Sequence, residues 1–167
     1  SPAPPRPPEQ LIAAYEKLLD EARANPKRAF ALLENNAPLG AVLPTYAAAL
    51  SETRGGAPAE AVCRAYEDWL AIADGLEAPG REKLSGAFGA LGRNFEAYTR
   101  ALVELDRKQQ LLSTIERFRP IWTHNMGLGM LGDAAFRGGL DDLAEGYYLR
   151  LHEGLEHWWR SDSAENL

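Results

Sequence analysis

The chain has 167 residues, of which 46% are hydrophobic and 25% are charged, and its formal net charge is -6. This composition excludes a disordered or fibrous protein, and the length fits one globular domain with a real core. The acidic balance argues against nucleic acid as a partner, because phosphate contact needs a basic stripe.

Two further features bear on the compartment. Cys63 is the single cysteine, so no internal disulfide can form. No apolar run approaches the roughly 20 residues that span a bilayer, so we expect no membrane span. A cytoplasmic location fits these features best, and a secreted or periplasmic origin after removal of a signal peptide stays open.

Both ends of the sequence look like boundaries. Prolines occupy most of residues 1–8 and favour an extended polyproline conformation, so this segment is expected to be a stiff proline-rich tether. Residues 164–167 resemble the remnant of an expression tag. The helical domain is therefore expected over residues 9–163.

The first half of the chain shows apolar residues at helical spacing. Helices are expected over 9–24, from 26 to the asparagine pair at 35–36, over 38–53 and over 58–76. Asn25 should cap the second helix, with Pro26 in its first turn, where a missing N–H costs nothing. Pro44 should either kink or restart the third helix, because its ring removes a backbone hydrogen bond.

Residues 81–119 carry the longest apolar pattern. Apolar side chains recur there in alternating steps of four and three, at Leu84, Phe88, Leu91, Phe95, Tyr98, Leu102, Leu105 and Leu112. Because no glycine or proline interrupts the polar run at 106–110, we predict one continuous helix, roughly 57 Å long at 1.5 Å per residue. The shorter helices should pack along it. A seam of this length also suggests association with a second copy of the chain.

Pro120 ends this pattern, and two more helices are expected over 121–137 and 140–159, separated by Gly138 and Gly139. No segment alternates convincingly with period two. The sequence therefore predicts an all-α fold, a bundle or short helical solenoid of six or seven helices around one long central helix.

The C-terminal hairpin, residues 120–160, concentrates the chemically versatile side chains of the chain. His152 and His157 are five residues apart and point about 140° from each other on a helix, so they do not readily bind one metal ion. We expect no metal and no cofactor. No nucleophile with its base, phosphate-binding loop or paired carboxylates can be recognised, so an enzyme is not indicated.

Four residues at the start of this hairpin form a candidate ligand pocket: Trp122, His124, Met126 and Met130. Such a pocket would hold a small apolar ligand or cofactor. The alternative is structural, with Gly127, Gly129 and Gly132 permitting close helix approach while the aromatic side chains fill the core.

Trp158 and Trp159 are adjacent and point about 100° apart on a helix, so both cannot face the same buried neighbour. The apolar stripe that includes Leu151 places Trp158 inside and Trp159 at the surface. Tryptophan is enriched at binding hot spots, so Trp159, with His152 and Arg160 as a polar rim, is the predicted partner contact. Packing of Trp159 against a loop or an N-terminal helix is the alternative.

The same hairpin resembles one tetratricopeptide unit over residues 120–153. Small and large positions of that repeat are matched by Leu131, Gly132, Gly139, Ala144 and Tyr148. Ala135 and Leu151 depart from the pattern, and no second copy lies roughly 34 residues upstream, although such arrays need about three units. The resemblance implies a helical hairpin with a protein-binding groove.

The segment from Arg119 to His124 resembles the Arg-x4-His signature of the HEPN helical ribonucleases. The resemblance implies that Arg119 and His124 would be a catalytic pair at a dimer interface. Pro120 departs from the family's pattern and places Arg119 outside the helix that carries His124.

Together these features favour a non-catalytic helical module for protein–protein interaction or assembly, an adaptor tethered by its proline-rich arm. Its partner would be another protein, another domain of the same polypeptide or a second copy of the chain. A bundle that binds a small apolar ligand or cofactor, and a HEPN-like ribonuclease, are the alternatives.

Overall fold

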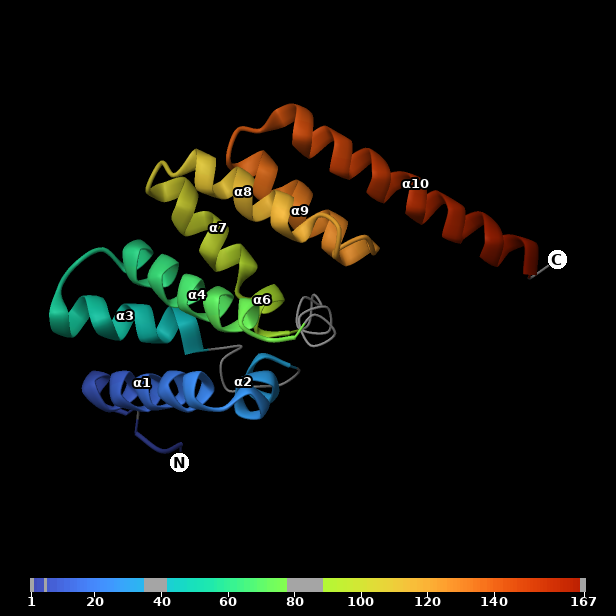
Figure 1. The fold of residues 1–167 in the computed structure, drawn as a ribbon. Helices are drawn as coiled ribbons and strands as arrows, with labels where there is room; N and C mark the ends of the chain where they lie inside the picture. Colours follow the sequence, from blue (N-terminus) through green and yellow to red (C-terminus); the bar gives the residue numbers. More distant parts are fainter. Residues whose placement is uncertain (1, 5, 35–41, 78–88, 166–167) are drawn as a thin grey trace. The chain divides into compact units, whose positions relative to one another are not determined.

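The computed structural model describes residues 2–4, 6–34, 42–77 and 89–165; of Val42 and residues 161–165 it describes the backbone alone. Within these ranges the chain forms nine helices and no strand, which confirms the all-α fold class. The chain divides into two compact units, Ser1–Leu105 and Asp106–Leu167, called unit 1 and unit 2 below (Figure 1). None of the described helices is both long and apolar enough to cross a bilayer.

Unit 1 contains six of the helices. They are α1 (Pro8–Ala24), α2 (Pro26–Leu33), α3 (Val42–Arg54), α4 (Pro58–Asp74), α6 (Ala90–Arg93) and α7 (Phe95–Glu104). Helix α3 packs against both α1 and α4, and α4 also packs against α7. Asn25 caps α2 as expected, because its Oδ1 accepts hydrogen bonds from the backbone N–H groups of Lys27 and Arg28. Pro44 lies in the first turn of α3, where it breaks no helical hydrogen bond.

Aromatic side chains form the centre of unit 1. The ring of Tyr15 stacks on Tyr46 at a centroid distance of 3.8 Å, and its hydroxyl accepts a 2.7 Å hydrogen bond from Nε1 of Trp69. Tyr66 stacks on Tyr98 at 4.2 Å. These contacts join α1 to α3 and α4, and α4 to α7, so large aromatic rings hold these helices together.

The predicted single helix over 81–119 is wrong. Residues 81–88 lie outside the described part, and the rest forms α6, α7 and α8 (Lys108–Phe118). The chain turns between α7 and α8 at Asp106, which has a φ of 55°, a left-handed conformation that aspartate tolerates better than most residues. Because no glycine or proline marks this turn, the apolar residues on both sides of it were interpreted as one helix. The extra breaks also explain why the described helices outnumber the predicted six or seven.

The turn at Asp106 changes which residues of α8 are buried. The buried positions there are Leu111, Thr114, Ile115 and Phe118, whereas the predicted stripe residue Leu112 is only half-buried. The turn therefore shifts the buried face by one residue. Upstream of it, Leu91, Phe95, Tyr98 and Leu102 are buried as the stripe predicted.

Unit 2 consists of α8, α9 (Asn125–Arg137) and α10 (Asp141–Glu165), with α9 packed against both of the others. Helix α9 begins four residues later than expected, because the chain from Arg119 to His124 forms a turn in which the backbone N–H of Trp122 donates to the carbonyl of Phe118. Their rings stack at 4.3 Å, and both are buried.

Glycines allow α9 and α10 to lie close together. A Cβ on Gly129 would lie 3.7 Å from Leu151, one on Gly132 would lie 2.7 Å from the ring of Tyr148, and one on Gly154 would lie 2.9 Å from Asn125. Contacts that run in opposite directions along the two helices define an antiparallel hairpin, the α9–α10 hairpin. Gly132 thus permits the close approach that the structural interpretation expected, whereas a Cβ on Gly129 would make only an ordinary contact and Gly127 lies against Trp122.

Replacing Leu102 by alanine should lower the free energy of unfolding by about 2–5 kcal/mol, because its side chain is fully buried and truncation leaves a cavity. Chemical denaturation followed by circular dichroism measures the change. The neighbouring Val103 is 36% exposed, so Val103→Ala is the control and should cost less than about 1 kcal/mol. Parent stability in Leu102→Ala would contradict the placement of Leu102 in the core.

Gly132→Ala should lower the melting temperature, because the new Cβ would overlap the ring of Tyr148 and push the two helices apart. Gly146→Ala is the matched control. A Cβ on Gly146 meets nothing within 4 Å, and alanine favours a helix over glycine by up to about 1 kcal/mol, so this variant should melt higher. Two thermal melts test the pair, and equal stability of Gly132→Ala and the parent would rule out close packing at this point.

Candidate functional site

Large apolar side chains at the surface gather on the α9–α10 hairpin. The exposed ones there are Met126, Phe136, Leu149, Leu155, Trp158 and Trp159. Elsewhere in the described chain, the large hydrophobic side chains in this exposed class are Val103 and Ile121, each only just over one-third exposed. A cluster of this kind on one supersecondary unit is typical of an interaction surface.

Helix α10 is much longer than its neighbour α9 (Figure 1). Asn125, the first residue of α9, lies against Gly154, and α10 continues from there to Glu165. The part of α10 after Gly154, called the overhang, therefore extends about 16 Å past the start of α9, at 1.5 Å per residue. Leu155, Trp158 and Trp159 all lie on it.

The expectation that Trp158 would be buried is wrong. Trp158 is 59% exposed and Trp159 is 67% exposed, and their ring centroids are 6.2 Å apart. On the apolar stripe of α10, Tyr147 is buried, and Leu151, which lies against Gly129 of α9, is half-buried. Trp158 continues that stripe into the overhang, where α9 no longer lies alongside α10.

Trp159 and its predicted polar rim are all exposed on α10. His152 is seven residues before Trp159, two helical turns, so the two side chains share one face. Arg160 donates from Nη2 to Oε1 of Glu156 at 2.7 Å, an exposed ion pair of a kind that contributes little to stability. The predicted contact residues therefore lie on one stretch of the helix surface.

A groove at the other end of the hairpin was missed by the sequence analysis. Its lining residues are Phe136, Asp141, Ala144, Glu145, Tyr148 and Leu149, and its volume is about 380 Å³. We call it the Phe136–Leu149 groove. Leu149 is two residues from Tyr147 and from Leu151, hence about 200° around the helix from each. A large apolar residue so far off the buried stripe was the signal that could have revealed this groove.

The ring of Tyr148 is fixed in this groove by two contacts. It packs against the backbone of Gly132, and its hydroxyl donates a 2.6 Å hydrogen bond to Oδ1 of Asp133. Burial, together with the Asp133 carboxylate, raises the pKa of Tyr148 to about 12. The hydroxyl therefore stays protonated at neutral pH and keeps donating.

The residues predicted to line a ligand pocket differ in exposure. Trp122 is fully buried against Phe118, and His124 caps α9 by accepting a 3.0 Å hydrogen bond at Nδ1 from the backbone N–H of Gly127. Gly127 also lies against Trp122, so these residues meet. Met126 is exposed and Met130 is half-buried, one turn apart on α9. The buried contacts of Trp122 fit the structural interpretation of this segment.

Arg119 and His124 do not share a helix. Arg119 is the C-cap residue of α8, and His124 is the N-cap residue of α9, with Pro120 in the turn between them. The departure from the HEPN pattern at Pro120 therefore coincides with a break between helices.

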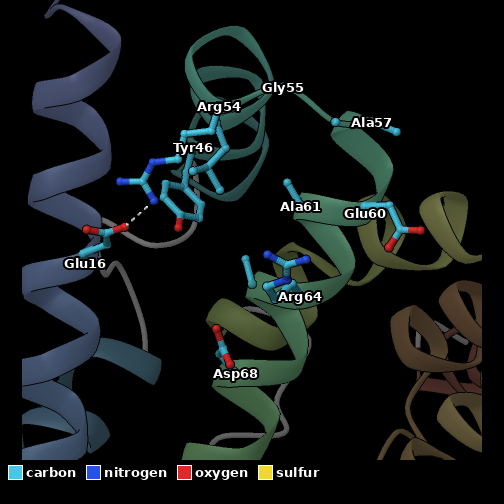
Figure 2. Close-up of a pocket in the computed structure, with 12 residues that line it drawn as sticks. Glu16, Tyr46, Arg54, Gly55, Ala57, Glu60, Ala61, Arg64 and Asp68 are labelled. Carbon is cyan, nitrogen blue, oxygen red and sulfur yellow. Dashed lines mark hydrogen bonds and ion pairs between the residues drawn. The ribbon is translucent and has the colours of Figure 1, made fainter.

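Unit 1 contains a polar cleft between α1, α3 and α4, with a volume of about 400 Å³ (Figure 2). Arg54 pairs with Glu16 across it at 3.1 Å, and Asp68, one turn along α4 from Arg64, pairs with Arg23 at 3.5 Å. Because Glu16 and Asp68, two of the three carboxylates that line the cleft, already have an arginine partner, this arrangement favours a junction between helices over a site for a charged ligand.

Tyr46 lines the same cleft. Burial raises the pKa of its hydroxyl, and the nearby Glu16 carboxylate adds to the effect. Among the residues that the structure describes, no group of three or more His, Cys, Asp or Glu side chains could hold a metal ion.

Comparison with protein-family models, with curated proteins and with solved structures finds no match to the chain. The tetratricopeptide and HEPN resemblances therefore rest on their short motifs alone, and the case for function rests on the surface of the hairpin.

The exposure of the two C-terminal tryptophans can be measured directly. Trp69 and Trp122 are buried, so iodide should quench only the fluorescence of Trp158 and Trp159. The double variant Trp158→Phe/Trp159→Phe should lose nearly all of the quenchable emission, and each single variant should lose part of it. An unchanged quenchable fraction in the double variant would show that the overhang is covered.

Proposed function

We propose that the chain is a non-catalytic module for protein–protein interaction or assembly, and that the α9–α10 hairpin is its contact surface. The concentration of exposed Phe, Leu, Met and Trp side chains on that one hairpin carries the proposal. Aromatic side chains that are left in water at a folded surface commonly serve as anchors in an interface.

The part of the hairpin where α9 and α10 lie side by side is a preformed support for the exposed Phe136 and Leu149. The helices approach closely at Gly132, and Tyr148 is held by both packing and a hydrogen bond. Side chains displayed from a preformed surface lose less conformational entropy on binding than those on a loose segment. This rigidity supports a role in recognition.

Within this surface, Trp159 is the proposed anchor, with His152 and Arg160 beside it. Its 67% exposure leaves a large apolar area for a partner to bury. The exposed pair between Arg160 and Glu156 can be exchanged at low cost for a contact with the partner. Leu155 and Trp158 extend the same apolar surface along the overhang.

The N-terminal arm supports the adaptor part of the proposal. Its described side chains before α1 are exposed, and Pro7 has φ -55° and ψ 144°, the polyproline conformation. Such a segment acts as a semi-rigid spacer that joins a module to its surroundings.

A small-ligand pocket around Trp122 receives less support. Trp122 is covered by Phe118, and its backbone lies against Gly127, so the ring is a packing element of unit 2. We therefore prefer the exposed hairpin over this segment as the site of recognition.

Photo-crosslinking with benzoylphenylalanine in place of Trp159 tests the proposal in cell extract. An adduct with another protein, or with a second copy of the chain, is expected at position 159 and not at exposed Glu52 of α3, the control position. The mass of the adduct distinguishes the two kinds of partner. Absence of an adduct at 159, or equal labelling at 52, would contradict the proposal.

Trp159→Ala should keep the melting temperature of the parent, because the side chain is exposed, while its affinity for the crosslinked partner falls by about thirtyfold, the effect of a hot-spot residue. Calorimetric titration and a thermal melt measure the two quantities. A lower melting temperature with unchanged affinity would identify Trp159 as a packing residue instead.

A further inference from the structure

We propose that the Phe136–Leu149 groove binds an amphipathic helix of the partner that is basic and inserts a large apolar side chain. This inference rests on the proposed function, since it names the chemistry of the partner for the same hairpin. It also extends the contact surface to residues that lie well away from Trp159.

The floor of the groove is apolar. Phe136, at the end of α9, is 64% exposed, and Leu149 of α10 is 54% exposed, yet both line the same cavity. The buried Ala144 and the fixed ring of Tyr148 complete the floor. An apolar side chain placed there would remove both exposed side chains from water, which is the main driving force for such docking.

The rim of the groove is acidic. Asp141 and Glu145 lie one turn apart on α10, and the lining includes no basic side chain. Neither carboxylate forms an ion pair with another residue in the described part of the chain. This differs from the cleft of unit 1, where Glu16 and Asp68 each pair with an arginine.

The apolar floor and the acidic rim together indicate the chemistry of the partner. Lysine or arginine beside an apolar anchor would pair with the rim carboxylates while the anchor fills the floor. An acidic partner would be repelled by the same carboxylates and by the net charge of -6. A groove formed along a rigid helix pair suits the helix-in-groove mode, in which apolar anchors repeat every three or four residues.

The test uses two synthetic 18-residue amphipathic helices that carry a fluorescent label, one built of leucine and lysine and the other of leucine and glutamate. Fluorescence anisotropy with the full chain measures their affinity. The leucine–lysine peptide should bind at least about tenfold more tightly than the leucine–glutamate peptide, and its affinity should fall as salt is raised. Equal affinity of the two peptides would overturn the proposal.

Matched variants distinguish the groove from general attraction to an acidic protein. Asp141→Lys should weaken the leucine–lysine peptide by about tenfold or more, whereas Asp142→Lys, the same charge change about 100° around the helix, should have little effect. Equal losses in the two variants would show charge attraction alone and overturn the proposal.

The floor is tested in the same way. Leu149→Ala should weaken binding of the leucine–lysine peptide. Leu149→Met, which keeps a large apolar side chain, should bind this peptide about as tightly as the parent does. Circular dichroism verifies that each variant keeps its helix content. Unchanged binding in Leu149→Ala would overturn the proposal.

The result can be separated from that of the crosslinking experiment. If position 159 yields a specific adduct while neither peptide binds the groove, this inference fails and the proposed function stands. If position 159 yields no adduct, the proposed function fails whatever the peptides do.

Discussion

The close contact between α9 and α10 is the constraint on which the candidate surface depends. The contact is possible because glycines stand where the helices meet, above all Gly132, against which the ring of Tyr148 lies. With its hydroxyl bound to Asp133, Tyr148 fixes the rotation of α10 relative to α9. That rotation turns Tyr147 into unit 2 and leaves Leu149 on the outside, at the groove that Phe136 also lines.

The length of α10 is the second cause of the exposed surface, since every turn past Gly154 lies beyond the start of α9. The exposed apolar surface is therefore a consequence of packing and of helix length.

Large aromatic residues form the packing contacts at the centre of unit 1. Tyr15, Tyr46 and Trp69 join three helices through a stack and a hydrogen bond, and Tyr66 donates from its hydroxyl to the carbonyl of Leu91 at 2.6 Å. Burial of Tyr15 raises its pKa well above the ordinary value, so its hydroxyl remains neutral inside the unit. Five described aromatic side chains of unit 1 are buried in its core, whereas Trp158 and Trp159 of unit 2 remain at the surface; the buried ones are Tyr15, Tyr66, Trp69, Phe95 and Tyr98. This contrast is why the proposed contacts lie on the hairpin.

Periodicity and capping residues predicted most of the helices, because those signals are local. The cap at Asn25 and the buried stripe of α7 are examples. The turn at Asp106 could not be predicted. It is formed by an aspartate in a left-handed conformation, and no glycine or proline nearby in the sequence signals a break. Part of the site could also be predicted from the pattern within one helix, since Trp159 was expected at the surface. The exposure of Trp158 depends on how far α9 extends along α10, which is a property of the tertiary structure. Predicting the Phe136–Leu149 groove would have required the geometry of the hairpin and the rotation of α10. The residue pattern of a single helix contains neither.

The proposed function requires that the side chains exposed on the α9–α10 hairpin become covered when the partner binds. Fluorine NMR of the chain labelled with 5-fluorotryptophan, recorded with a soluble paramagnetic agent, tests this claim for all four tryptophans at once. In the free chain the signals of Trp158 and Trp159 should broaden, and those of the buried Trp69 and Trp122 should not. In the complex with the partner recovered through position 159, the signals of Trp158 and Trp159 should become protected from broadening while the two buried signals stay unchanged. Continued broadening of both surface signals in the complex would contradict the proposed function.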